Sequence, residues 1–181
     1  MLTTYTDYLN QWNSQHPDQV WLRERSGDST TDWTWSQAHR EINAMACWFE
    51  SRFATTGQSV GLLSRNRAHW YFADLSACAA GHVVVPMFTT APGETTDYVM
   101  SFTDTKVLFV GETENWDQVR QVLPEGILLI ALPGVDLAQE HRDVTFAADV
   151  FGKNRVGALE NFTHVFAAPG EQAEVGARLC H

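Results

Sequence analysis

Four short apolar runs, separated by segments of helical character, constrain the fold of this chain more than any other feature. The runs cover residues 59–64, 83–87, 106–110 and 127–131, and each is far too short to span a membrane. Strands that read as uninterrupted apolar runs are typical of parallel sheets that are buried on both faces. The sequence therefore predicts an α/β fold, with a mostly parallel sheet and helices on both faces.

The segment that precedes the runs predicts a helix followed by a hairpin. Aromatic and apolar residues recur at three- and four-residue steps within residues 4–15, which indicates an amphipathic helix. Residues 20–25 and 31–35 flank the turn-forming sequence SGDS at 26–29. Two such runs around a turn are typical of a β-hairpin.

Capping and proline signals place the helices that separate the runs. Thr34 is followed three residues later by Gln37, a capping box that begins a helix reaching about residue 53. Asn66 is the expected N-cap of the next helix, and Pro86 is expected at a sheet edge because proline cannot donate a ladder hydrogen bond. Further helices are expected over residues 92–103 and 116–123.

A length of 181 residues fits a single domain, 1–181, with three parts. The helix and hairpin occupy residues 1–35, and the βα core occupies residues 36–131. Residues 132–181 form an irregular segment, in which we expect a loop with a short helix up to residue 157 and a further strand over 163–167.

Charge and cysteine content exclude several classes of function. The formal net charge is −10, and Lys106 and Lys153 are the only lysines, so nucleic acid and anionic membranes are not expected partners. No run is long enough for a membrane span, and the N-terminus lacks the features of a secretory signal. Three cysteines without CxxC spacing suit a reducing cytoplasm.

Local chemistry in the sequence is sparse. Arg65, Asn66 and Arg67 follow the first apolar run, where they form either an anion site at a helix N-terminus or an Asn cap with two solvated arginines. The shortness of the motif favours the second interpretation. The histidines lack the spacing of a helical metal site, and the serines lack the GxSxG elbow, so no catalytic or metal-binding residue is assigned.

Three stretches resemble motifs of the AMP-forming acyl-CoA synthetases, a branch of the adenylate-forming superfamily. They are WTWSQA at 33–38, VGLLSRNRAHW at 60–70 and ACAAGHVVVPM at 77–87. The likeness continues in register over most of residues 5–131 and is nearest to the long-chain fatty acid–CoA ligases. It implies the fold of that family's N-terminal subdomain.

The resemblance also implies a phosphate-binding loop of the form Y-T-S-G-T-T-G-x-P-K-G-V. Aligned without gaps, residues 166–181 keep the aromatic residue, the late glycine and the closing histidine of this motif as Phe166, Gly176 and His181. The positions between them are occupied by Ala167, Ala168, Pro169, Gly170, Glu171, Gln172, Glu174 and Val175.

These replacements turn an attractive loop into a repulsive one. Val175 stands where the family has its lysine, and Glu171 and Glu174 add negative charge. A carboxylate about 4 Å from a phosphate costs roughly 1 kcal/mol in water and more in a drier site. Alternatively, residues 163–181 are a divergent tail and the ungapped match is accidental. Both interpretations leave the chain without a phosphate loop.

The resemblance implies a truncated, non-catalytic ligase-like domain with a binding or assembly role. Self-association or a protein partner is then expected to cover the face left by the missing half. Alternatively, another chain completes a split fatty acid–CoA ligase that uses ATP, Mg²⁺ and CoA, whereas the chain alone has no predicted cofactor. A third possibility is a binder of nucleotide or acyl-adenylate without turnover.

Overall fold

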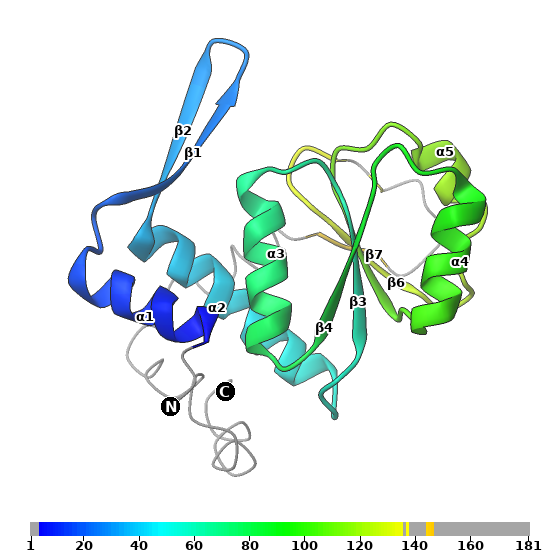
Figure 1. The fold of residues 1–181 in the computed structure, drawn as a ribbon, viewed down its shortest axis with the longest axis horizontal. Helices are drawn as coiled ribbons and strands as arrows, with labels where there is room; N and C mark the ends of the chain where they lie inside the picture. Colours follow the sequence, from blue (N-terminus) through cyan, green and yellow to red (C-terminus); the bar gives the residue numbers. More distant parts are fainter. Residues whose placement is uncertain (1–3, 136, 138–143, 147–181) are drawn as a thin grey trace.

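A five-stranded parallel sheet and a separate two-stranded hairpin organise the computed structural model, which describes residues 4–135, 137 and 144–146 (Figure 1). The helices are α1 (Tyr5–Gln15), α2 (Trp35–Arg52), α3 (Ala68–Ala79), α4 (Gly93–Thr103) and α5 (Trp116–Val119). The strands are β1 (Val20–Ser26), β2 (Ser29–Thr34), β3 (Ser59–Leu63), β4 (Val83–Met87), β5 (Val107–Val110), β6 (Leu128–Ala131) and β7 (Val144–Phe146). The order in the large sheet is β4-β3-β5-β6-β7.

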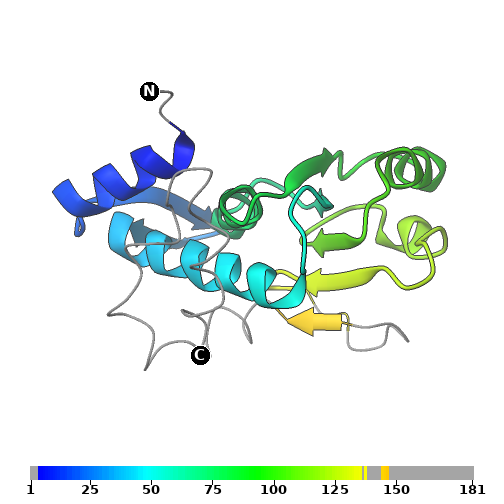
Figure 2. The ribbon, with the colours of Figure 1, turned by 90° about the horizontal axis from the view of Figure 1, so that it is seen from below.

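Alternation along the strands divides the interior into two cores. Val60 and Leu62 of β3 belong to the core that includes α2 and α3, whereas Leu63 belongs to the core that includes α4 and α5. Figures 1 and 2 show these two pairs of helices on opposite sides of the sheet. The predicted parallel sheet with helices on both faces is therefore confirmed.

Strand β4 forms one edge of the sheet, as the proline in it predicts. The Val83 N–H donates to the Gln58 carbonyl at 2.9 Å, so the backbone N–H groups of alternate residues from Val83 onward point toward β3. Pro86 falls in the other set, and the N–H that it lacks would face the open edge.

The hairpin formed by β1 and β2 projects from the body of the molecule (Figure 1). The capping box predicted at its end is confirmed. The Gln37 N–H donates to Thr34 Oγ1 at 3.2 Å, and the Thr34 N–H donates to Gln37 Oε1 at 2.9 Å. Helix α1 begins with a capping box of the same kind, between Thr4 and Asp7.

The predicted elements need three corrections. Helix α5 ends at Val119 rather than at residue 123, and Leu123 is buried in the same core as Val119 from the irregular segment that follows the helix. Strand β7 lies where a loop with a short helix was expected, and a three-residue strand is too short to give a periodic signal. Asn66 is not an N-cap, because Arg67 holds that position without a side-chain cap hydrogen bond.

The strand expected over 163–167 lies outside the described residues. Among the helices that are described, none is both long enough and apolar enough to cross a bilayer.

Candidate functional site

A cavity of about 620 Å³ lies at the carboxyl ends of β3, β5 and β6, the edge at which parallel α/β sheets bind ligands. The hairpin lines it with Glu24, Ser26, Thr31 and Trp33. The end of β5, the loops after β3 and β5, and the starts of α3 and α5 line it with Ser64, Arg67, His69, Val110, Gly111, Glu112, Thr113 and Trp116. The segment after β6 adds Leu132, Pro133, Gly134, Val135 and Leu137.

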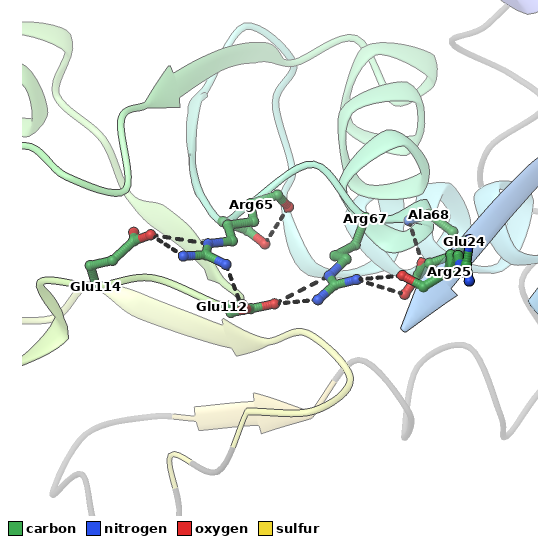
Figure 3. A network of polar contacts seen from close by, with 8 residues as sticks. Glu24, Arg25, Arg65, Arg67, Ala68, Glu112 and Glu114 are labelled. Atoms are coloured by element: carbon green, nitrogen blue, oxygen red, sulfur yellow. Dashed lines mark hydrogen bonds and ion pairs between the residues drawn. The ribbon is translucent and has the colours of Figure 1, made fainter. Parts of the chain in front are cut away.

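Five side chains of alternating charge run along this edge, and we call them the charge ladder: Glu24, Arg67, Glu112, Arg65 and Glu114 (Figure 3). Arg67 lies 3.8 Å from Glu24 and 2.7 Å from Glu112. Arg65 contacts Glu112 at 3.1 Å, and its Nε donates to Glu114 at 3.0 Å. The ladder thus connects β1, the loop after β3 and the loop after β5.

The carboxylates of the charge ladder offset the positive charge of both arginines. A hydrogen bond from Arg67 lowers the pKa of Glu112, and a hydrogen bond from Arg65 lowers the pKa of Glu114, so both carboxylates stay ionised. The same contacts raise the pKa of each arginine. Three acids face two bases, which leaves one negative charge in excess along the ladder.

A carboxylate of the chain occupies the N-terminus of α3. The Ala68 N–H donates to Glu24 Oε2 at 2.9 Å, while Asn66 is exposed. Neither sequence interpretation of this loop is right, because Asn66 does not cap the helix and the arginines are paired with glutamates rather than solvated alone. The Ala68 N–H, which could otherwise bind an external anion at this helix N-terminus, already binds the Glu24 carboxylate.

An aromatic contact sets the hairpin wall of the cavity. The ring of His69 packs edge-on against Trp33, with the two ring centroids 5.2 Å apart. Trp33 also meets Phe72 edge-on at 5.1 Å. Burial lowers the pKa of His69, so its imidazole is neutral near pH 7.

The floor of the cavity depends on a close approach between β3 and β5. A Cβ added at Gly111 would lie 2.1 Å from Ser64 Oγ, a distance that no packing adjustment of a few tenths of an ångström can relieve. The Gly111 N–H donates to the Leu63 carbonyl at 2.9 Å, which fixes this backbone in place. Glycine is therefore required here for space.

The degenerate loop predicted from the sequence, Ala167 to Gly176, lies outside the described residues. Within the part of the chain that is described, no three His, Cys, Asp or Glu residues gather as a metal site. Sequence reasoning missed Glu24, Glu112 and Glu114. The last two carried a signal, because they follow the β5 run as Arg65 and Arg67 follow the β3 run.

Comparison with known sequences identifies relatives of this chain. The family model described as AMP-binding enzyme matches residues 9–159. A long-chain-fatty-acid–CoA ligase of Xenopus laevis is 27% identical over 61% of this chain, which covers 14% of that protein. A long-chain-fatty-acid–CoA ligase of Drosophila melanogaster is 27% identical over 67% of this chain and 18% of its own length. An uncharacterized protein of Mycobacterium tuberculosis is 28% identical over 65% of this chain and 66% of its own.

Solved structures share the fold. The anthranilate CoA ligase AuaEII in complex with anthranoyl-AMP superimposes with a TM-score of 0.68 at 18% identity, over 84% of this chain and 29% of that one. The N-terminal subdomain of Klebsiella oxytoca NpsA gives a TM-score of 0.60 at 16% identity, over 84% of this chain and 33% of that one. At these identities the likeness concerns the fold alone.

Proposed function

Over residues 9–159 the chain belongs to the AMP-binding enzyme family, and on that premise we propose that it is a non-catalytic, ligase-like domain with a binding or assembly role. The chain spans 14% and 18% of the Xenopus and Drosophila ligases, so the activity of those proteins is not transferred to it.

The pairing of Arg65 and Arg67 with glutamates carries the proposal. Charge-assisted contacts to arginine are a common means of holding phosphate, and here both guanidinium groups already bind carboxylates. A triphosphate at this edge would have to displace Glu112 while facing the excess charge of the ladder. The chain's net charge of −10 adds to this repulsion.

The sequence of residues 166–176 supports the same proposal. In the ungapped alignment, alanines replace the Thr-Ser pair of the family's phosphate loop, Gly170 and Glu171 replace its two threonines, and Val175 replaces its lysine. Glu171 and Glu174 thereby bring two further acids. The hydroxyl groups and the lysine that would hold the phosphates of ATP are therefore lacking in this stretch of sequence.

ATP–pyrophosphate exchange with Mg²⁺ and a series of fatty acids tests the proposal, with an active long-chain ligase as the positive control. We expect no exchange above background. We also expect no rise in Tm with AMP, ATP or an acyl-adenylate analogue at about 5 mM, because a ligand that binds only the folded state must raise stability. Exchange by the chain alone would contradict the non-catalytic role.

A second candidate function is the N-terminal part of an AMP-forming fatty acid–CoA ligase that uses ATP, Mg²⁺ and CoA once another chain completes it. The likeness to long-chain-fatty-acid–CoA ligases favours this candidate. Repeating the exchange assay with a co-expressed ligase fragment separates the two, because activity that needs both chains supports only the second candidate.

The assembly role takes the form of self-association or of a protein partner, in the cytoplasm. Exposed aromatic side chains on α4 support it, since Tyr98 is 67% exposed and Phe102 is 78% exposed. Exposed apolar patches mark interaction surfaces in many proteins.

A further inference from the structure

The cavity at the carboxyl edge has the size and lining of a small-molecule site. Its volume of about 620 Å³ lies within the roughly 300–1,000 Å³ of ligand pockets. Val110, Leu132 and Leu137 give it an apolar lining, and the indole rings of Trp33 and Trp116 line it from the hairpin and from α5. Such a lining suits a ring or another compact apolar group.

Two of the four hydroxyl groups that line the cavity, those of Ser64 and Thr113, already donate their protons to backbone carbonyls. Ser64 Oγ donates to the Arg65 carbonyl at 2.9 Å, and Thr113 Oγ1 donates to the Thr89 carbonyl at 3.1 Å. A hydroxyl that donates elsewhere offers only lone pairs to a ligand. Toward the cavity, Ser64 and Thr113 therefore act as acceptors.

The charged groups that line the cavity give the same result. Glu24 and Glu112 are carboxylates, which accept only, and the guanidinium of Arg67 is shared between them at 3.8 and 2.7 Å. Two acids against one base leave an excess negative charge at the cavity. A ligand acid would be repelled, and a ligand donor or cation would be attracted.

We propose that this cavity binds a compact aromatic compound that carries an amino or other hydrogen-bond donor group and no acid group. The inference deepens the proposed binding role and rests on it. It commits the site to uncharged or singly cationic ligands, in contrast to the acids and nucleotides that AMP-forming ligation requires.

Three probes with the same ring and different charge test the preference: phenethylamine, phenylacetamide and phenylacetate. Binding to the full chain is measured by titration calorimetry and by the rise in Tm at pH 7. We expect the amine to bind at least about fivefold more tightly than the carboxylate, with the amide between them. Equal binding, tighter binding of phenylacetate, or no binding of any probe would overturn the inference.

Variants locate the binding in the cavity. Thr31→Phe adds a ring at an exposed hairpin position that lines the cavity, and it should weaken phenethylamine at least about fivefold by filling the space. Glu112→Gln removes the excess charge, so the preference for amine over carboxylate should fall to within about twofold. Glu125→Gln makes the same change at an exposed residue just before β6, away from the carboxyl edge, and should keep the full preference.

The two proposals fail separately. ATP–pyrophosphate exchange by the unmodified chain would contradict the non-catalytic role and leave the probe preference intact. Loss of the preference in Glu125→Gln, or its survival in Glu112→Gln, would contradict the assignment of that preference to the cavity and leave the non-catalytic role untouched.

Discussion

Gly111 directly follows β5 and lies against Ser64, which directly follows β3, and it gives a direct prediction at the scale of one residue. In Gly111→Ala the new Cβ would lie 2.1 Å from Ser64 Oγ and 2.5 Å from Ser64 Cβ, and Ser64 is only 5% exposed. We expect a loss of about 1–3 kcal/mol in the free energy of unfolding, measured by urea denaturation. The double variant Ser64→Gly/Gly111→Ala should recover part of it. A single variant as stable as the parent would contradict the close approach.

His39 predicts a loss of stability in mild acid. Its Nε2 lies 2.8 Å from Asn10 Oδ1, and burial, with a smaller effect of Arg40, lowers the pKa from 6.5 to about 4. His39 therefore takes up a proton more readily in the unfolded chain than in the folded one. The contribution of neutral, buried His39 to the free energy of unfolding is full above pH 6.5 and is lost as the pH falls toward 4. The loss should reach about 3 kcal/mol.

Denaturation midpoints between these pH values measure the effect of His39. The variant His39→Gln keeps a polar side chain without the titration, so its stability should fall less steeply over the same range. Parallel pH profiles for parent and variant would contradict the assignment to His39.

At the scale of elements, the N-terminus of α3 depends on the hairpin rather than on its own sequence. Glu24→Ala should remove the acceptor at 2.9 Å from the Ala68 N–H and cost about 1 kcal/mol. Asp32→Ala on the same hairpin breaks only the exposed pair with Arg23, and Asn66→Ala touches no cap, so both should cost less. Urea denaturation of the three variants ranks them, and a cost for Asn66→Ala that equals that of Glu24→Ala would contradict the cap.

Helix beginnings could be predicted where the signal is local. Thr34 and Gln37 are three residues apart, and the structure confirms their capping box. Glu24 and Ala68 are 44 residues apart, and the Arg67–Glu112 contact joins residues separated by 45. Such contacts depend on how the hairpin and the loops meet in space, which no local pattern encodes. The sequence predicted a cap at Asn66 because Asn is a common cap, and a tertiary contact overrode it.

At the scale of the whole molecule, the four apolar runs were sufficient to predict four of the five strands of the sheet and its two covered faces, but not β7. The runs in β3, β5 and β6 are almost fully buried, and burial on both faces requires helices on both sides. The cavity was not predictable, because its walls come from four separate segments: the hairpin, the segment after β3, the segment after β5 and the residues after β6. The charge ladder connects the first three of these, so the geometry of the site is a property of the assembled fold.

The proposed assembly role predicts self-association through α4. Tyr98 and Phe102 stack on each other with their centroids 6.0 Å apart and remain mostly exposed, whereas Trp12 on α1 already stacks on Trp35. Sedimentation velocity should show an average mass that rises with protein concentration. The rise should be larger at about 0.5 M than at about 0.05 M NaCl, because salt screens the repulsion between chains of net charge −10.

Tyr98→Ser/Phe102→Ser should reduce the rise in mass, and the matched variant Tyr5→Ser/Tyr8→Ser on α1 should not. An equal effect of both variants, or a mass independent of concentration, would contradict association through α4.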